Sequence, residues 1–157
     1  MIRVEGTRDF PMAAAPAFDY ITDPVNWPDY WPDLIEVETP GASWSRAGDQ
    51  MRLRLMFAGR PTAMRMTMET VVRPEVVIYD SAQAGLPAMR HERYFEARDS
   101  GLHYRIAVAY EPRPGLSGLL DRTLVRAGVR RVLNRTLDNL TRELTARAAP
   151  GGDSHSG

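Results

Sequence analysis

The sequence contains no cysteine and no lysine, and both absences narrow what the chain can do. Without cysteine, disulfide bonds and thiolate metal sites are excluded. Without lysine, all 20 basic residues are arginine, a bias that by itself favours no function. Twenty acidic residues bring the formal net charge to zero. We therefore expect no nucleic-acid partner, because the whole chain offers no electrostatic attraction to phosphate.

Histidines and long apolar runs are also scarce. His91, His103 and His155 lie too far apart to form a ligand cluster at metal spacing, so we expect no metal and no cofactor. No apolar run approaches the roughly 20 residues of a membrane span. The N-terminus alternates polar with apolar residues, which is unlike a signal peptide. These observations predict a soluble, cytoplasmic protein without integral membrane association.

The most frequent pattern in the sequence is the alternation of apolar and polar residues, which is typical of strands with one dry face. It begins in the segment 2–10 and returns in six later segments, which short turns rich in glycine and proline separate. In the first of these later segments, Ile35 and Val37 alternate with Glu36 and Glu38. Strands joined by tight turns pair antiparallel, and a sheet with one apolar face must cover something.

Three helices are predicted beside the strands. Ala13–Thr22 and a short turn that begins at Asp23-Pro24 follow the first strand. A helix from Leu116 to about Arg147 ends the domain and would be roughly 45 Å long. Its apolar stripe lies at helical spacing and comprises Val129, Leu133, Leu137, Leu140 and Leu144.

The fold class is therefore α+β, with a curved seven-stranded antiparallel sheet wrapped around the long C-terminal helix. Only this helix is long enough for such a sheet to cover. We predict a single domain over residues 1–147 and a disordered tail over 148–157, which is small and polar.

The order of elements and one motif resemble a known superfamily. The motif is Phe18-Asp19-Tyr20-Ile21-Thr22-Asp23-Pro24-Val25-Asn26-Trp27-Pro28-Asp29-Tyr30-Trp31-Pro32. Together they resemble the SRPBCC superfamily, the helix-grip fold of START lipid-transfer domains and polyketide cyclases, and most of all its bacterial polyketide cyclase/dehydrase and lipid-transport group. The resemblance extends to Arg147. It implies an apolar cavity between the sheet and the C-terminal helix, with the two short helices at its mouth.

Three functional hypotheses follow from this resemblance. The first is binding of a small hydrophobic molecule, which is lipid-like, aromatic or polyketide-like, by a monomer or homodimer. The second is an enzyme of the polyketide cyclase, aromatase or dehydratase type that uses the same cavity. The third is an accessory protein whose helix end contacts a partner chain. We favour the first, a binding protein without catalytic activity, because no nucleophile elbow, phosphate loop or paired-carboxylate motif is present.

Two groups of candidate ligand-binding residues come from the strands and the motif. Met64, Met66 and Met68 share one strand face and either line an adaptable pocket or belong to an ordinary core. Tyr30 and Trp31 either cap the mouth of the pocket or pack the short helices onto the sheet. For the neighbouring Trp27 we favour packing.

The third group of candidates is polar. If Phe95 faces inward, His91 and Arg93 face inward with it, and Tyr104 and Tyr110 on the next strand join them. His91, Arg93 and Tyr104 are the catalytic candidates, which would orient and protonate a substrate. Alternatively the group orients a ligand carbonyl or carboxylate, or a slip of one residue leaves it exposed. The predicted ligand-binding set is completed by Tyr79, Leu120 and Leu124.

Arg122, Arg126 and Arg130 recur every four residues at the start of the long helix. On a straight helix they would continue the stripe of Leu133 and Leu137. Either a bend near Gly128 turns them to solvent, or they meet an anion at the end of the pocket. We favour the bend, and we expect the N-terminal half of the helix to lie over the cavity and the C-terminal half to seal one end of the sheet.

Overall fold

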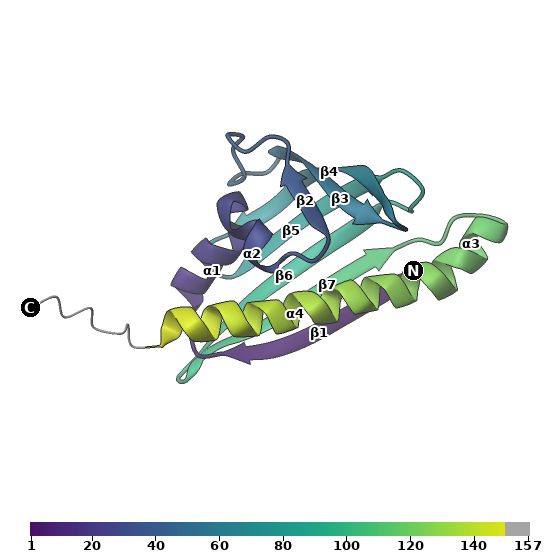
Figure 1. The fold of residues 1–157 in the computed structure, drawn as a ribbon. Coiled ribbons are helices and arrows are strands. Elements are labelled where there is room, and N and C mark those ends of the chain that lie inside the picture. Colours follow the sequence, from purple (N-terminus) through teal and green to yellow (C-terminus); the bar gives the residue numbers. More distant parts are fainter. Residues whose placement is uncertain (150–157) are drawn as a thin grey trace, which may run out of the picture.

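The structure, a computed structural model, describes residues 1–149 and consists of one antiparallel sheet and a long helix (Figure 1). The sheet order is β1-β7-β6-β5-β4-β3-β2, and every neighbouring pair is antiparallel. The strands are β1 (Ile2–Phe10), β2 (Leu34–Val37), β3 (Gln50–Phe57), β4 (Arg60–Val72), β5 (Val76–Gln83), β6 (Met89–Arg98) and β7 (Gly101–Tyr110). The predicted helix-grip fold is confirmed.

The short helices after β1 are α1 (Ala14–Thr22), the 3-10 turn η1 (Pro24–Asn26) and α2 (Trp27–Tyr30). The side chain of Asp23 begins η1 by accepting a hydrogen bond from the Val25 amide at 3.0 Å. The Trp27 indole and the Tyr30 hydroxyl both donate to the carbonyl of Ile21, at 3.0 and 2.6 Å. These two aromatic side chains therefore fasten α2 to the end of α1.

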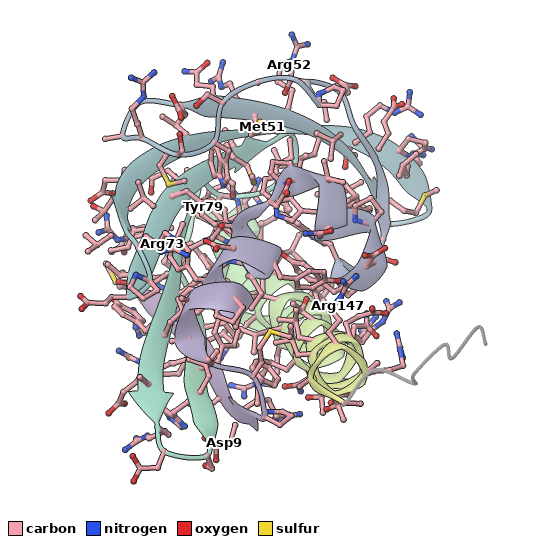
Figure 2. The ribbon with its side chains drawn as sticks, turned by 90° about the vertical axis from the view of Figure 1, so that its left-hand side faces the viewer. Asp9, Met51, Arg52, Arg73, Tyr79 and Arg147 are labelled. Carbon is pink, nitrogen blue, oxygen red and sulfur yellow. The ribbon has the colours of Figure 1, made fainter. Side chains whose placement is uncertain are left out.

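The C-terminal helix runs as α3 (Leu116–Leu120), a π-helical turn η2 (Asp121–Val125) and α4 (Arg126–Ala148). Leu133, Leu137, Leu140 and Leu144 of α4 are buried, as their helical spacing predicts. Figure 2 looks along α4 and shows the sheet curving around it. Of the predicted tail, residues 150–157 lie outside the described residues, and the division into one domain stays a prediction.

The neighbours Met51 and Arg52 illustrate the alternation within the sheet (Figure 2). Met51 is fully buried on the inner side, whereas two thirds of the Arg52 side chain is exposed on the outer side. In β2 the predicted alternation of apolar and polar residues is wrong, because a bulge between Leu34 and Glu36 breaks it. Ile35 is therefore 41% exposed instead of facing inward.

Close contact between α4 and β1 depends on Gly6. A Cβ at this position would lie 2.8 Å from the terminal methyl carbons of both Leu133 and Leu137. Because glycine has no side chain, the two leucines pack directly on the strand backbone. This contact fixes the distance between the helix and its edge of the sheet.

No helix within residues 1–149 is long and apolar enough to cross a membrane.

Gly101, the first residue of β7, lies close to the backbone of Phe10 at the end of β1, and this close approach can be tested. Its φ is +140°, and an added Cβ would lie 2.1 Å from the carbonyl oxygen of Phe10. We expect Gly101→Ala to lower the free energy of unfolding by about 2 kcal/mol or more. Urea denaturation measures the change. Gly85→Ala is the matched control, since its φ is +83° but its surroundings are open, and a cost of about 1 kcal/mol is expected. Equal costs at both positions would contradict the close approach to Phe10.

Candidate ligand-binding cavity

A cavity of about 490 Å³ lies between the inner face of the sheet and the N-terminal half of the long helix. The helix covers it with residues between Leu124 and Thr136, whereas Leu140 and Leu144, further along, are fully buried in the core. The apolar lining includes Leu55, Met64, Leu86, Met89, Ile106, Val108, Leu124, Val125, Val129, Val132 and Leu133. The expected division of the helix into a covering half and a sealing half therefore agrees with this arrangement.

The cavity reaches the surface between the β3–β4 turn and the helix. Met56 and Phe57, which lie before the turn, are 42% and 39% exposed, and both line the cavity. Opposite them, Leu124 is 69% exposed and also belongs to the lining. Arg131 and Arg135 of α4 are exposed lining residues as well. Asp33 lines the cavity too and forms a salt bridge with Arg135, so a molecule can enter along a border that is partly apolar and partly charged.

Arg93 brings a positive charge to the inner wall of this cavity. Its guanidinium donates hydrogen bonds of 3.0 Å to the hydroxyls of Tyr79 and Tyr104, and it lies 5.9 Å from the ring centre of Trp31. The residue is only 7% exposed, and within residues 1–149 no carboxylate forms a salt bridge with it. Because a buried charge without a counterion is costly, a ligand oxygen with negative charge would find a preorganised partner here.

His91 lies beside Arg93 on the same face of β6 and is held from two directions. Its ring stacks on that of Tyr79, with 4.6 Å between the ring centres and 7° between the planes. Its Nε2 lies 2.8 Å from the Ser81 hydroxyl, with which it shares a hydrogen bond. Burial, and secondarily the charge of Arg93, lowers the pKa of His91 to about 3. At neutral pH the imidazole is therefore uncharged, and the imidazolium form that could act as a general acid is not populated.

The lowered pKa of His91 predicts how stability depends on pH. Between the folded value of about 3 and the unfolded value of roughly 6.5, the unfolded chain binds more protons than the native protein. The contribution of His91 is thus complete above about pH 6.5 and is lost as the pH falls, by at most about 1.4 kcal/mol per pH unit. Denaturation of the wild type and of His91→Gln between about pH 7 and pH 4.5 measures this. The variant should lose stability less steeply on acidification, and parallel curves would show that His91 does not titrate in this way.

Six of the predicted ligand-binding residues line the cavity: Trp31, Met64, Tyr79, His91, Arg93 and Leu124. The structure therefore brings the strand residues and the motif residue Trp31 together. Among the catalytic candidates, His91 and Arg93 reach the cavity surface. Tyr104 does not, because it lies fully buried behind Arg93, where burial raises the pKa of its hydroxyl in spite of the nearby charge.

The remaining predicted ligand-binding residues do not line the cavity. They are either buried in other contacts or exposed to solvent. Tyr30 is buried against α1, and burial raises its pKa well above the ordinary value. Met66 and Met68 belong to the core, further along β4 than the cavity. The Tyr110 hydroxyl donates to the carbonyl of Asp121 at 2.8 Å, and Leu120 is 49% exposed without lining the cavity.

Two polar residues of β5 that line the cavity are absent from the predicted set, although the alternation could have indicated them. Ser81 and Gln83 follow Tyr79 at intervals of two on β5 and face the same side. Gln83 donates a hydrogen bond of 2.6 Å to the Thr62 hydroxyl on β4. Serine and glutamine are polar, so the pattern of apolar residues alone does not identify them as lining residues.

Arg122, Arg126 and Arg130 are exposed and do not line the cavity. The favoured orientation toward solvent is therefore confirmed, whereas the bend near Gly128 stays a prediction. The helix keeps α-helical hydrogen bonding through Gly128 and departs from it earlier, in the π-helical turn Asp121–Val125.

A second hollow of similar volume lies at the surface, near the start of α1 and the β6–β7 turn. Its lining includes Glu75, Glu96, His103 and Arg105, which are solvated side chains. Among the described residues that line it, none offers a buried polar group without a partner, and we do not place the site there. Within the described residues, no three histidine or acidic side chains are grouped as metal ligands.

Comparisons with solved structures place the fold among known proteins. The Zhui aromatase/cyclase from Streptomyces sp. R1128 superposes with a TM-score of 0.81 at 18% identity, over 96% of this chain and 98% of that one. A protein from Thermus thermophilus gives 0.74 at 16% identity, over 93% and 99% of the two chains. A Rhodobacter sphaeroides protein gives 0.72 at 15% identity, over 92% and 93%. At these identities the likeness concerns the fold alone.

Comparison with curated protein sequences finds no significant match. Among protein families, the model described as polyketide cyclase / dehydrase and lipid transport matches residues 1–145, which is nearly the whole chain. This chain therefore belongs to the polyketide cyclase / dehydrase and lipid transport family.

Proposed function

We propose that the protein binds a small, mostly hydrophobic molecule that carries one anionic or strongly polar oxygen. The observation that supports this most is Arg93, a buried charged group on the wall of a mostly apolar cavity, which has tyrosine hydroxyls but no salt-bridge carboxylate beside it within residues 1–149. A guanidinium in such a place can offer its remaining N–H groups to a carboxylate or a polarised carbonyl. The apolar walls would hold the rest of the molecule.

The size and the aromatic lining narrow the class of ligand. A volume of about 490 Å³ is within the range of roughly 300–1,000 Å³ for small-molecule sites. Trp31 lies close to the guanidinium, and the stacked pair of Tyr79 and His91 forms a flat surface beside it. A flat aromatic acid or a medium-length aliphatic acid fits these features.

Isothermal titration calorimetry with 2-naphthoate and naphthalene-2-methanol tests the proposal. The two probes share the ring system, and only the first carries a carboxylate. We expect the carboxylate to bind roughly ten to a hundred times more tightly, because a hydrogen bond to a charged group contributes about 1.5–3 kcal/mol. Equal affinities, or no binding of either probe, would contradict the proposal. Native mass spectrometry of the purified protein would in addition reveal a molecule that co-purifies.

A cyclase of the aromatase type is the second candidate function. Arg93, His91 and Ser81 line one cavity, and this arrangement supports it. Acid–base catalysis by the predicted group is not favoured. The lowered pKa of His91 makes it a weak base and leaves no imidazolium acid at neutral pH, and Tyr104 lies behind the wall. An enzyme with this cavity would act through Arg93, by stabilising the negative charge of an enolate. Conversion of a poly-β-ketone thioester to an aromatic product, followed by mass spectrometry with and without protein, separates the two functions.

A further inference from the structure

The end of the long helix exposes an unusual amount of apolar surface. Residues 1–149 expose ten large hydrophobic side chains, and four of these ten lie within nine positions of one another on α3 and η2. They are Leu116 (84% exposed), Leu119 (60%), Leu120 (49%) and Leu124 (69%). In Figure 1, α3 reaches beyond the ends of β1 and β7, so this apolar surface projects from the body of the protein. Exposed apolar surface that is grouped in this way marks an interaction site.

The same segment concentrates positive charge in a chain of zero net charge. Residues 112–137 contain six arginines and one acidic residue, Asp121. The salt bridges of this segment within the described residues are Arg113–Asp121 and Arg135–Asp33. Arg122, Arg126 and Arg130 are exposed and have no acidic partner within residues 1–149. We call the four leucines together with these three arginines the leucine–arginine end.

The one acidic residue holds this end in place instead of neutralising its surface. The Asp121 side chain is fully buried and accepts hydrogen bonds from the Arg113 amide at 2.8 Å and the Arg113 guanidinium at 2.7 Å. The Tyr110 hydroxyl donates to the Asp121 carbonyl at 2.8 Å. A Cβ on Gly118 would lie 2.0 Å from the Arg113 carbonyl oxygen, so α3 packs tightly on this segment. The exposed leucines are thus presented on a fixed support.

We propose that the leucine–arginine end docks the protein onto an anionic lipid membrane surface. Leucines can enter the boundary between headgroups and acyl chains while arginines contact lipid phosphates. A projecting apolar end suits a bilayer, which needs no preformed groove. Two copies joined through this end in a symmetric dimer would bring their unpaired arginines together. Leu124 belongs both to this end and to the cavity lining, so docking places the entrance of the cavity next to the lipid.

Flotation with vesicles of known composition tests the proposal and does not depend on the ligand of the cavity. The wild type should bind vesicles of phosphatidylcholine with phosphatidylglycerol, should not bind vesicles of phosphatidylcholine alone, and should be released at roughly 0.5 M salt. The double variant Arg122→Glu/Arg126→Glu should bind about tenfold more weakly or less. Arg46→Glu/Arg65→Glu makes the same change of charge at two exposed arginines elsewhere and should bind like the wild type. Absent binding to anionic vesicles, or equal loss in both double variants, would overturn the proposal.

Apolar insertion is tested separately with cysteine substitutions, since the chain has no cysteine of its own. An environment-sensitive dye on Leu119→Cys should shift to shorter wavelength with anionic vesicles. The same dye on Val25→Cys, an exposed apolar position on η1, should not shift. If analytical ultracentrifugation instead shows a dimer of the wild type that is lost in Leu116→Ser/Leu119→Ser, the leucines contact a second copy and the membrane proposal is wrong.

Discussion

Replacing Arg93 with methionine is expected to abolish the preference of the cavity for a carboxylate while leaving the protein folded. In calorimetry the affinity for 2-naphthoate should fall by roughly ten- to a hundredfold, to that of the alcohol analogue. The affinity for naphthalene-2-methanol should stay the same or rise, because methionine is apolar and adaptable. The charge, and not the general shape of the cavity, would then account for the selectivity.

The stability of the Arg93→Met variant follows from two opposing effects. Removing a buried charge without a counterion relieves a desolvation penalty of several kcal/mol. The hydroxyls of Tyr79 and Tyr104 lose the donor that each now accepts from at 3.0 Å, at a cost of about 1–3 kcal/mol each. These effects nearly cancel, so we expect the free energy of unfolding to stay within about 1–2 kcal/mol of the wild type.

Two control variants make this result interpretable. Arg93→Lys keeps a charge but cannot hold both tyrosines with one planar group, so it should retain part of the preference for the carboxylate. Arg65→Met removes an exposed arginine on the outer face and should alter neither binding nor stability. A large loss of stability in Arg93→Met, above about 3 kcal/mol, would instead assign Arg93 a structural role.

Which side chains face the inside of the sheet could be predicted from the sequence, because the alternation of side chains is a direct consequence of strand geometry. It placed His91 and Arg93 on the inner face together with Phe95, and all three side chains are there. It did not predict β2 correctly, since a bulge changes the alternation without leaving a signal in the residue types. The π-helical turn Asp121–Val125 was missed for the same reason.

The division between cavity and core could not be read from the alternation. Met64, Met66 and Met68 share one face of β4, yet only Met64 reaches the cavity. Which inward residue meets open space depends on where α4 crosses the sheet, and that is set by contacts distant in sequence, such as Gly6 with Leu133. Tyr30 and Trp31 are adjacent in sequence, yet Trp31 lines the cavity and Tyr30 is buried in the core. Contacts distant in sequence decide this difference as well.

Replacing Leu140 with alanine is expected to cost more stability than the same replacement at an exposed leucine in the half of the helix that covers the cavity. Leu140 is fully buried in the core and does not line the cavity. Its truncation should lower the free energy of unfolding by about 3 kcal/mol, since both transfer energy and packing are lost. Leu124→Ala makes the same chemical change on the same helix at a position that is 69% exposed, and should cost less than about 0.5 kcal/mol.

The contrast between Leu140 and Leu124 also bears on how a ligand enters. If the core anchors α4 through its C-terminal half, the half over the cavity can open without global unfolding. Hydrogen exchange should then show lower protection for the amides of residues 124–136 than for those of residues 137–147. Leu140→Ala should lower protection in both halves, whereas Leu124→Ala should affect only the first. Equal protection along α4 in the wild type would mean that the helix does not open separately, and a ligand would have to enter by movement of the β3–β4 turn, where Met56 and Phe57 border the cavity.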